Sequence, residues 1–357
     1  SAIPSLIYFD RPPYEYLSQF FKAMIQEIIE KLAKNEDLSV TQMQQAMEEI
    51  MTGRAQTKDI VSFLTALSNK GETVEELTAA VKVMRHHVTG ISTKHKVILD
   101  TCGTGGDRKG TFNVSTIVAF VASGAGITVA KHGNRSVSSS CGSADILEAL
   151  DININMSKEK IEKCLDEIGI AFLFAPNFHP AMKYAMPARK QIGKRTMFNI
   201  LGPLSNPAGA THQLVGVFDA YWTGVLAEVF LRLGTQHALV VHGQDGLDEI
   251  TTVAKTYVSE AHKGRVDNYE INPEDFGIQK SKLEDLLGAD AALNAKILMD
   301  ILNGKPGPKR DIVVLNAAAA IYAADKAGSI KEGIKFAAES IDSGKALEKL
   351  ELLRQYS

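Results

Sequence analysis

Three glycines and two aspartates crowd into the eight residues DTCGTGGD (100–107), which follow a short apolar run. Glycine at this density is unfavourable unless the backbone bends sharply or approaches a ligand closely. A dinucleotide fingerprint needs G-x-G-x-x-G, but Arg108 stands where the third glycine belongs, and the Walker A pattern is absent as well. The segment, called the glycine loop below, therefore predicts either a plain tight turn or another kind of phosphate-binding loop.

Polar residues after the glycine loop favour an anion site over a plain turn. Those around the start of the next predicted helix (113–126) are Thr111, Asn113, Ser115 and Thr116. Exposed N–H groups, hydroxyls and the helix dipole attract anions at such a position. Asp107 would repel a phosphate, so it suits a sugar hydroxyl, or a charged group with a metal ion in between.

A second polar loop, KHGNRSVSSSCGS (131–143), follows the predicted strand 127–131. Lys131 and Arg135 supply positive charge, and the serines and glycines supply hydroxyl donors and backbone freedom. This segment, called the serine loop below, predicts a second phosphate cradle built from many weak donors. The alternatives are a solvated polar loop and, for His132, a core histidine bonded to the backbone.

An acidic pair, Asp248 and Glu249, lies just beyond the predicted strand 237–243. Carboxylate oxygens without nearby histidine or cysteine ligands favour Mg²⁺, which is held partly through water and substrate phosphates. The alternative is a pair of acids at the N-terminus of a helix.

Two kinds of sequence must position these three loops. Residues 16–90 carry apolar residues at helical spacing between short polar breaks, which predicts a small helical bundle. From about residue 95, strands alternate with helices, which predicts an α/β domain with a central, mostly parallel sheet flanked by helices. Ligands of such sheets bind beyond the carboxyl ends of the strands, where the three loops begin. The predicted organisation is an irregular extension over 1–13, a helical domain over 14–92 and an α/β domain over 93–357.

The individual strands and the C-terminal helices are predicted from apolar runs. The strands are expected at 97–100, 127–131, 170–176, 212–218 and 237–243. Two long helices are expected at the end of the chain, one over 311–328 and one from Ser329 onward.

Composition excludes several other classes of protein. The net charge of −3 argues against nucleic acid and anionic membrane surfaces as partners. The chain has no run of 18 apolar residues and no signal-peptide pattern at its start, so we expect no membrane span. Its three cysteines form neither a disulfide framework nor a zinc pattern, which favours a reducing, cytoplasmic setting.

Five motifs in one order resemble a known family. They are GTGGD (103–107), NVST (113–116), KHGNRSVSS (131–139) with Ser143, FNILGPLSNPAG (198–209) and GLDE (246–249). Together they closely resemble the anthranilate phosphoribosyltransferases of tryptophan biosynthesis, over about nine-tenths of the chain. Members are glycosyltransferases that transfer the ribosyl phosphate of phosphoribosyl pyrophosphate (PRPP) to the amine of anthranilate.

The resemblance implies further properties of the chain. They are two Mg²⁺ ions per subunit, a homodimer formed through the helical domain, and a segment at about 190–210 that returns to pack with that domain. An amidotransferase or anthranilate synthase subunit is an implied partner. Electrostatic catalysis is expected without a catalytic base, because an arylamine is already neutral at pH 7.

The resemblance also assigns residues to each ligand. For PRPP they are Gly103, Gly106, Asp107, Thr111, Asn113, Val114, Ser115, Thr116, Lys131, His132, Gly133, Asn134, Arg135, Ser136, Val137, Ser138, Ser139 and Ser143. For anthranilate they are Gly103, His132, Asn134, Pro176, His179 and Arg189, with Ala175 along the access path. For the metal they are Ser115, Asp248 and Glu249.

Some features depart from the family pattern. The first dozen residues match nothing in it, and Met182 stands where several members have an aromatic residue beside the anthranilate path. The runner-up is a pyrimidine nucleoside phosphorylase, which shares the two-domain architecture but has a KHSTGG-type run and needs no acidic metal pair. A nucleic-acid-binding relative with a degraded site is disfavoured by the net charge of −3 and the intact acidic pair.

Overall fold

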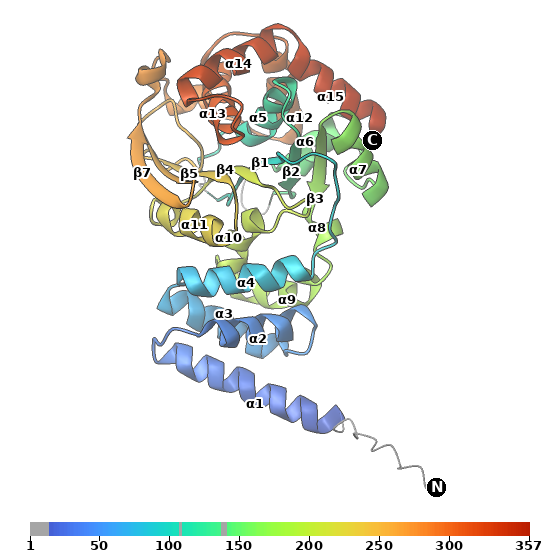
Figure 1. Ribbon diagram of the computed structural model, residues 1–357, viewed down its shortest axis with the longest axis vertical. Helices are drawn as coiled ribbons and strands as arrows, with labels where there is room; N and C mark the ends of the chain where they lie inside the picture. Colours follow the sequence, from blue (N-terminus) through green and yellow to red (C-terminus); the bar gives the residue numbers. More distant parts are fainter. Residues whose placement is uncertain (1–13, 107–108, 137–140) are drawn as a thin grey trace, which may run out of the picture.

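A bundle of helices forms one end of the molecule (Figure 1). The computed structural model of the chain describes residues 14–106, 109–136 and 141–357. The bundle consists of α1 (Tyr14–Ala33), α2 (Val40–Met51), α3 (Thr57–Lys70) and α4 (Val74–His86). Ser39 and Thr73 begin α2 and α4 with capping boxes, which satisfy N–H groups that the helix cannot pair itself. Fully buried residues such as Met43, Met47 and Phe63 form its core.

The other end contains a seven-stranded sheet of order β3-β2-β1-β4-β5-β6-β7 among the described residues. Its parallel strands are β1 (Leu99–Gly103), β2 (Val129–Gly133), β3 (Ile170–Phe174), β4 (His212–Gly216) and β5 (His237–Gly243). The predicted mostly parallel sheet is thereby confirmed. The strand predicted at 127–131 is displaced, because β2 begins and ends two residues later.

An antiparallel hairpin that the sequence analysis did not identify completes the sheet. It consists of β6 (Thr256–His262) and β7 (Arg265–Ile271), and β6 pairs with β5. The two-residue turn, Lys263–Gly264, has positive φ at both residues, at 49° and 80°. Such turns match the twist of the paired strands.

Helices cover both faces of the sheet (Figure 1). One face packs against α5 (Val114–Gly124) and α13 (Pro308–Ala323), and α11 (Tyr221–Arg232) covers β5 and β6 on the other. The remaining helices are α6 (Ser143–Ala149), α7 (Lys158–Glu167), α8 (Ala175–Phe178), α9 (Met182–Ile192), α10 (Met197–Leu204), α12 (Ala291–Leu302), α14 (Ile330–Asp342) and α15 (Lys345–Tyr356). The prediction of a single helix from Ser329 onward is wrong. Gly344 adopts a φ of 78° and divides this part of the chain into α14 and α15.

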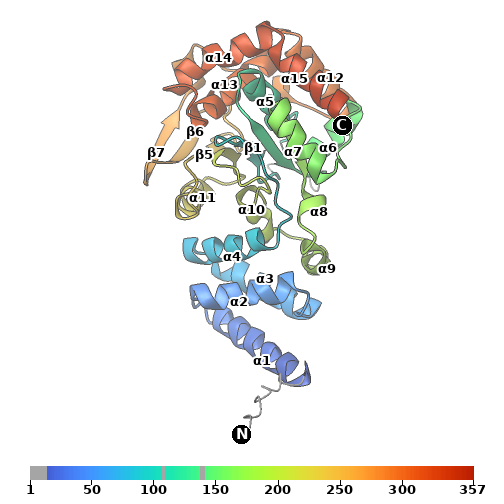
Figure 2. The same cartoon turned by 45° about the vertical axis from the view of Figure 1, so that its right-hand side comes forward.

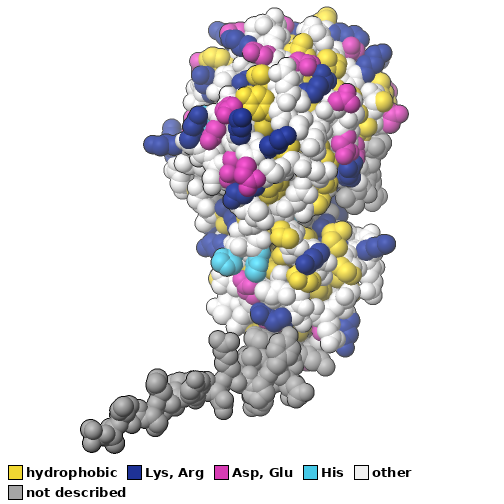
Figure 3. Space-filling model, turned by 90° about the vertical axis from the view of Figure 1, so that its right-hand side faces the viewer, with side chains coloured by type: hydrophobic (Ala, Val, Ile, Leu, Met, Phe, Trp, Pro, Cys, Tyr) yellow, Lys and Arg dark blue, Asp and Glu magenta, His cyan; other side chains and the backbone are white. Residues whose placement is uncertain are grey.

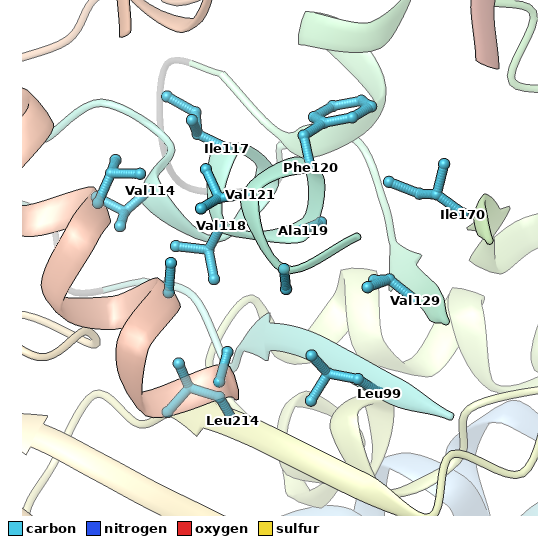
Figure 4. Packing of buried hydrophobic residues seen from close by; sticks show 14 of the residues in the cluster. Leu99, Val114, Ile117, Val118, Ala119, Phe120, Val121, Val129, Ile170 and Leu214 are labelled. Atoms are coloured by element: carbon cyan, nitrogen blue, oxygen red, sulfur yellow. The ribbon is translucent and has the colours of Figure 1, made fainter. Parts of the chain in front are cut away.

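The α/β core centres on α5, whose side chains are buried almost all round. Ile117, Phe120 and Val121 of α5 lie in one cluster with Leu99, Val129, Ile170 and Leu214 from four neighbouring strands (Figure 4). This apolar packing anchors α5 to the sheet and fixes where the helix begins.

Chain segments from the middle of the sequence connect the two ends of the molecule. Helix α9 packs against α2 and α3, and α10 and α11 both contact α4 (Figure 2). Acidic and basic side chains are interspersed on the face seen in Figure 3. Within the described ranges, every helix is too short or too polar to cross a membrane.

Candidate functional site

Four neighbouring strands end on glycine at one edge of the sheet. Gly103, Gly133, Gly216 and Gly243 end β1, β2, β4 and β5, and the strand order places these ends side by side. The glycine loop follows β1, the serine loop follows β2, and the acidic pair lies beyond β5. This edge, called the loop edge below, therefore brings together the three segments that the sequence placed in one crevice.

The glycine loop and the acidic pair are in direct contact. The backbone N–H of Gly105 donates a hydrogen bond to Asp248 Oδ2 at 3.0 Å. Gly105 and Gly106 have φ of 67° and 84°, which side-chain-bearing residues rarely adopt. A Cβ on Gly103 would lie 2.9 Å from the same Asp248 oxygen. The glycines thus allow the backbone to approach a carboxylate on the neighbouring loop.

Gly216 controls the position of the acidic pair, and its replacement provides a test. A Cβ at Gly216 would lie 1.6 Å from the Asp248 carbonyl oxygen, so Gly216→Ala must displace the backbone of that loop. We expect Gly216→Ala to lower kcat/KM of the transferase reaction implied by the sequence by about 100-fold, the order seen when reacting groups are misplaced by about 1 Å. In the control, Gly224→Ala on α11, the new Cβ has its nearest contact at 4.0 Å, so activity should be unchanged. Full activity of Gly216→Ala would show that the loop position does not matter.

Lys131 is a buried cation between the loops. Its Nζ donates to the Thr101 carbonyl oxygen and, at 3.1 Å, to Ser115 Oγ. Burial lowers the pKa of Lys131 below its usual value, although the nearby Asp100 and Glu249 carboxylates oppose this shift. Lys131 therefore lies close to Ser115, at the start of α5, and to a member of the acidic pair.

Asp100 is a supporting residue that the sequence analysis did not assign. It is fully buried and accepts hydrogen bonds from Asn206 Nδ2 at 2.7 Å and from the His132 N–H at 3.1 Å. Burial raises the pKa of Asp100 to about 6, although the charge of Lys131 opposes the shift. Asp100 thus joins β1, the serine loop and the FNILGPLSNPAG segment.

His132 and His179 form a buried pair. Their Nε2 atoms are 3.2 Å apart, although 47 positions separate them in the chain. Burial lowers the pKa of His132 to about 3 and that of His179 to about 4. Both rings are therefore neutral at pH 7, and one donates a hydrogen bond to the other. Two residues assigned to anthranilate are thus adjacent.

The start of α5 connects the glycine loop to the serine loop. Asn113 Oδ1 caps the helix by accepting from the Thr116 N–H at 3.1 Å. The Thr116 hydroxyl lies 2.9 Å from that of Ser143 at the start of α6. Val114 is buried in the core and contributes packing. Thr111 pairs with Leu287 in an isolated bridge, so the segment before α5 is held from its other side.

Other predicted residues lie at the margin of this arrangement. Asn134 is exposed, and its Oδ1 accepts the Arg135 N–H at 2.7 Å. Arg135 is also exposed, and its guanidinium pairs with Asp145 and Glu148 of α6. Asp145 also accepts from the Ser136 N–H at 3.1 Å, which closes the serine loop onto α6.

The remaining assigned residues lie on α8 and α9 or outside the described part of the chain. Pro176 is exposed at the start of α8, and Ala175 is half-buried beside it. Arg189 lies 5.8 Å from the centre of the Phe198 ring, and burial lowers its pKa. The assignments that lie outside the described residues are Asp107, Val137, Ser138 and Ser139.

Arg195 is a further residue that the sequence analysis missed. Its guanidinium donates to the Gly106 carbonyl oxygen and lies 3.8 Å from the centre of the Phe218 ring. The only sequence signal was its place in the basic run before FNILGPLSNPAG, and that signal does not show which loop the side chain reaches.

The described donor atoms suit a hard cation. Asp248 and Glu249 are half-buried carboxylates, and Ser115 supplies a hydroxyl oxygen close to Lys131. An oxygen-only set with phosphate ligands nearby is the environment that Mg²⁺ prefers. These residues therefore fit a magnesium-assisted site for a phosphorylated substrate.

Comparisons with known proteins agree with this arrangement. The model of the glycosyl transferase family a/b domain matches residues 95–347, and that of its helical bundle domain matches residues 26–88. Anthranilate phosphoribosyltransferase of Methanocorpusculum labreanum is 55% identical over 92% of this chain and 97% of its own length. The same enzyme of Petrotoga mobilis is 50% identical, covering 94% and 97%.

Solved structures give the same result. Anthranilate phosphoribosyltransferase from Thermus thermophilus superposes with a TM-score of 0.88 and 40% identity, covering 92% of this chain and 98% of its own. The Saccharomyces cerevisiae enzyme in complex with PRPP and Mg superposes with a TM-score of 0.86 and 30% identity, covering 94% and 98%. By sequence, domain content and fold, this chain belongs to the anthranilate phosphoribosyltransferase family.

Proposed function

We propose that this chain transfers the 5-phosphoribosyl group of PRPP to the amine of anthranilate, giving N-(5-phosphoribosyl)anthranilate and pyrophosphate in tryptophan biosynthesis. The observation that carries the proposal is the meeting of three loops at one sheet edge, with Asp248 bonded to the glycine loop. Relatives of 50–55% identity bear the name of this activity.

The reaction is a substitution at the anomeric carbon, so the protein must stabilise charge on the departing pyrophosphate. Lys131 and the N-terminus of α5 supply positive potential at the loop edge. Asp248, Glu249 and Ser115 would hold two Mg²⁺ ions, which neutralise pyrophosphate charge when bound. The yeast relative was solved with PRPP and Mg.

Attack by anthranilate requires positioning rather than a strong base. Its arylamine is neutral at pH 7, and the His132–His179 pair is neutral as well. We propose that this pair, with Asn134, Gly103 and Pro176, orients the aromatic substrate, and that Arg189 binds its carboxylate. Holding two reactants in line supplies several kcal/mol of rate enhancement.

Arg189→Ala tests the carboxylate assignment. Loss of a charge-assisted hydrogen bond is worth about 1.5–3 kcal/mol, so we expect the KM for anthranilate to rise about 10- to 100-fold. The KM for PRPP should change by less than about twofold. The matched control is Lys190→Ala, which removes an exposed positive charge from the same helix and should change neither constant. Equal rises in both KM values for Arg189→Ala would contradict the assignment.

We further propose how the enzyme is organised in the cell. The helical domain spans 14–92 and the α/β domain 93–357, and the segment at about 190–210 returns to pack with the helical domain, its FNILGPLSNPAG part forming the hinge side. The contact of α10 with α4 supports the return of this segment to the helical domain. A homodimer through the helical domain, a cytoplasmic location and association with an amidotransferase or anthranilate synthase subunit complete the proposal.

The activity is tested most directly by the fluorescence of anthranilate. The signal should fall when PRPP and Mg²⁺ are both added to enzyme and anthranilate, and it should stay constant when either is omitted. A constant signal with all components, together with phosphorolysis of a pyrimidine nucleoside, would replace the proposal with the phosphorylase alternative.

A further inference from the structure

A cluster of histidines and carboxylates lies at the sheet edge opposite the loop edge. His237 begins β5 and pairs in register with His262, the last residue of β6. Asp325 follows α13 and reaches both rings. Because β5 is seven residues long, roughly 20 Å of strand separates this cluster from the loop edge. The proposed transferase activity uses none of its residues.

His237 has a carboxylate oxygen at each ring nitrogen. Its Nδ1 lies 2.8 Å from Asp325 Oδ1, and its Nε2 lies 2.9 Å from Glu260 Oε1. A neutral imidazole carries only one N–H, so only one of these short contacts is then a hydrogen bond. At the other contact, a ring lone pair faces a carboxylate oxygen. The two atoms repel each other unless a cation, either a further proton or a metal ion, binds there.

Glu260 determines which nitrogen is free for a metal. It accepts hydrogen bonds from the hydroxyls of Tyr269 at 2.8 Å and Tyr322 at 2.7 Å. Three short contacts, from His237 Nε2 and the two tyrosine hydroxyls, therefore hold the Glu260 carboxylate in place. A fixed carboxylate of this kind holds a metal-binding histidine in one tautomer. With Nε2–H donating to Glu260, the lone pair of Nδ1 faces Asp325.

His262 supplies a third ligand atom. Its Nε2 lies 3.7 Å from Asp325 Oδ1, and one ligand atom from each of His237, His262 and Asp325 lies within 4.8 Å of the others. We propose that these three residues bind a divalent transition-metal ion such as Zn²⁺, with Glu260 as a positioning residue. Two imidazoles and one carboxylate suit Zn²⁺ or Co²⁺ better than Mg²⁺.

The free space beside His262 fits this assignment. The His262 ring stacks on that of His237 with centroids 3.8 Å apart and an angle of 3°, so their lone pairs lie in parallel planes. His262 must therefore turn to ligate the ion. Its contacts with Asp325 and Glu260, at 3.7 and 3.8 Å, are too long for hydrogen bonds. An open cavity of about 860 Å³, lined by Glu260, His262, Tyr269, Tyr322 and Asp325, leaves room for this turn and for a water ligand.

The test is a Co²⁺ titration of metal-free, untagged full-length protein in excess Mg²⁺, which masks the acidic pair at the loop edge. We expect one Co²⁺ per chain, with the strong visible absorption of a four-coordinate site, and its displacement by Zn²⁺. His262→Ala should weaken Co²⁺ binding at least about tenfold, in line with the loss of a ligand. His86→Ala, which removes an exposed histidine from α4, is the matched control and should bind Co²⁺ unchanged.

A second variant and a second readout keep the proposal falsifiable. Asp325→Asn changes a half-exposed side chain and should weaken Co²⁺ binding as His262→Ala does. Zn²⁺ should raise the Tm of the unsubstituted chain, and at the same concentration it should raise the Tm of either variant less. Absence of the absorption band would show that a proton alone bridges His237 and Asp325, and full binding by His262→Ala would show that Co²⁺ binds without His262; either result overturns the proposal. Since no substrate is present, either result leaves the proposed transferase activity untouched.

Discussion

Replacing Asp248 with Asn and Glu249 with Gln together should lower kcat/KM for PRPP by about 100- to 1,000-fold, the effect typical of losing preorganised transition-state electrostatics. The physical reason is that both carboxylates lie at the loop edge, one bonded to Gly105 and one beside Lys131. The loss should be greatest at limiting Mg²⁺, because the variant loses the charged ligands for the ion. Steady-state kinetics over a series of Mg²⁺ concentrations measures both effects.

The control for this variant removes two carboxylates elsewhere. Glu339→Gln with Asp342→Asn changes exposed residues of α14 and should leave kcat/KM and its Mg²⁺ dependence unchanged. If Asp248→Asn with Glu249→Gln kept its turnover and PRPP affinity at limiting Mg²⁺, the acidic pair would not be the metal site.

Lys131→Met should both destabilise and inactivate the protein. Removing one partner from a buried charged network typically costs about 3–5 kcal/mol, because the remaining charge is uncompensated. Asp100 would be left buried without its nearby cation, and its pKa would rise further above the present value of about 6. Denaturant unfolding and kcat/KM measure the two losses.

The stability deficit of Lys131→Met should depend on pH in a defined direction. Above pH 4 the unfolded chain releases the Asp100 proton, whereas the folded variant retains it up to its raised pKa. The folded state then binds more protons, so the free energy of unfolding falls as pH rises through this window. The free energy of unfolding of Lys131→Met should therefore fall further below that of the unsubstituted chain at pH 8 than at pH 5.5. Lys280→Met, an exposed control, should show no such difference, and a pH-independent deficit would refute the role assigned to Asp100.

Local patterns were sufficient for most of the fold. Helical spacing predicted α2 to α4, because a helix with one buried face carries apolar residues at regular intervals. Apolar runs predicted β1 to β5, because a strand buried on both faces is apolar throughout. The β6–β7 hairpin was missed because β7 contains Asp, Asn and Glu, which are rare in strands, and because polar residues interrupt the apolar residues of β6. The division of the last helix depended on Gly344, which can end a helix or lie within one.

By itself, the sequence determined where the three loops lie, which strand each one follows and the family to which the chain belongs. Each of these can be recognised from a motif of contiguous residues. The tertiary structure alone decided the contacts of Asp100 with Asn206, of His132 with His179 and of Arg195 with Gly106. It also decided the cluster of His237, His262 and Asp325 on the opposite edge. Such contacts join residues that are tens of positions apart, and burial then sets their charge states, so no local spacing encodes them.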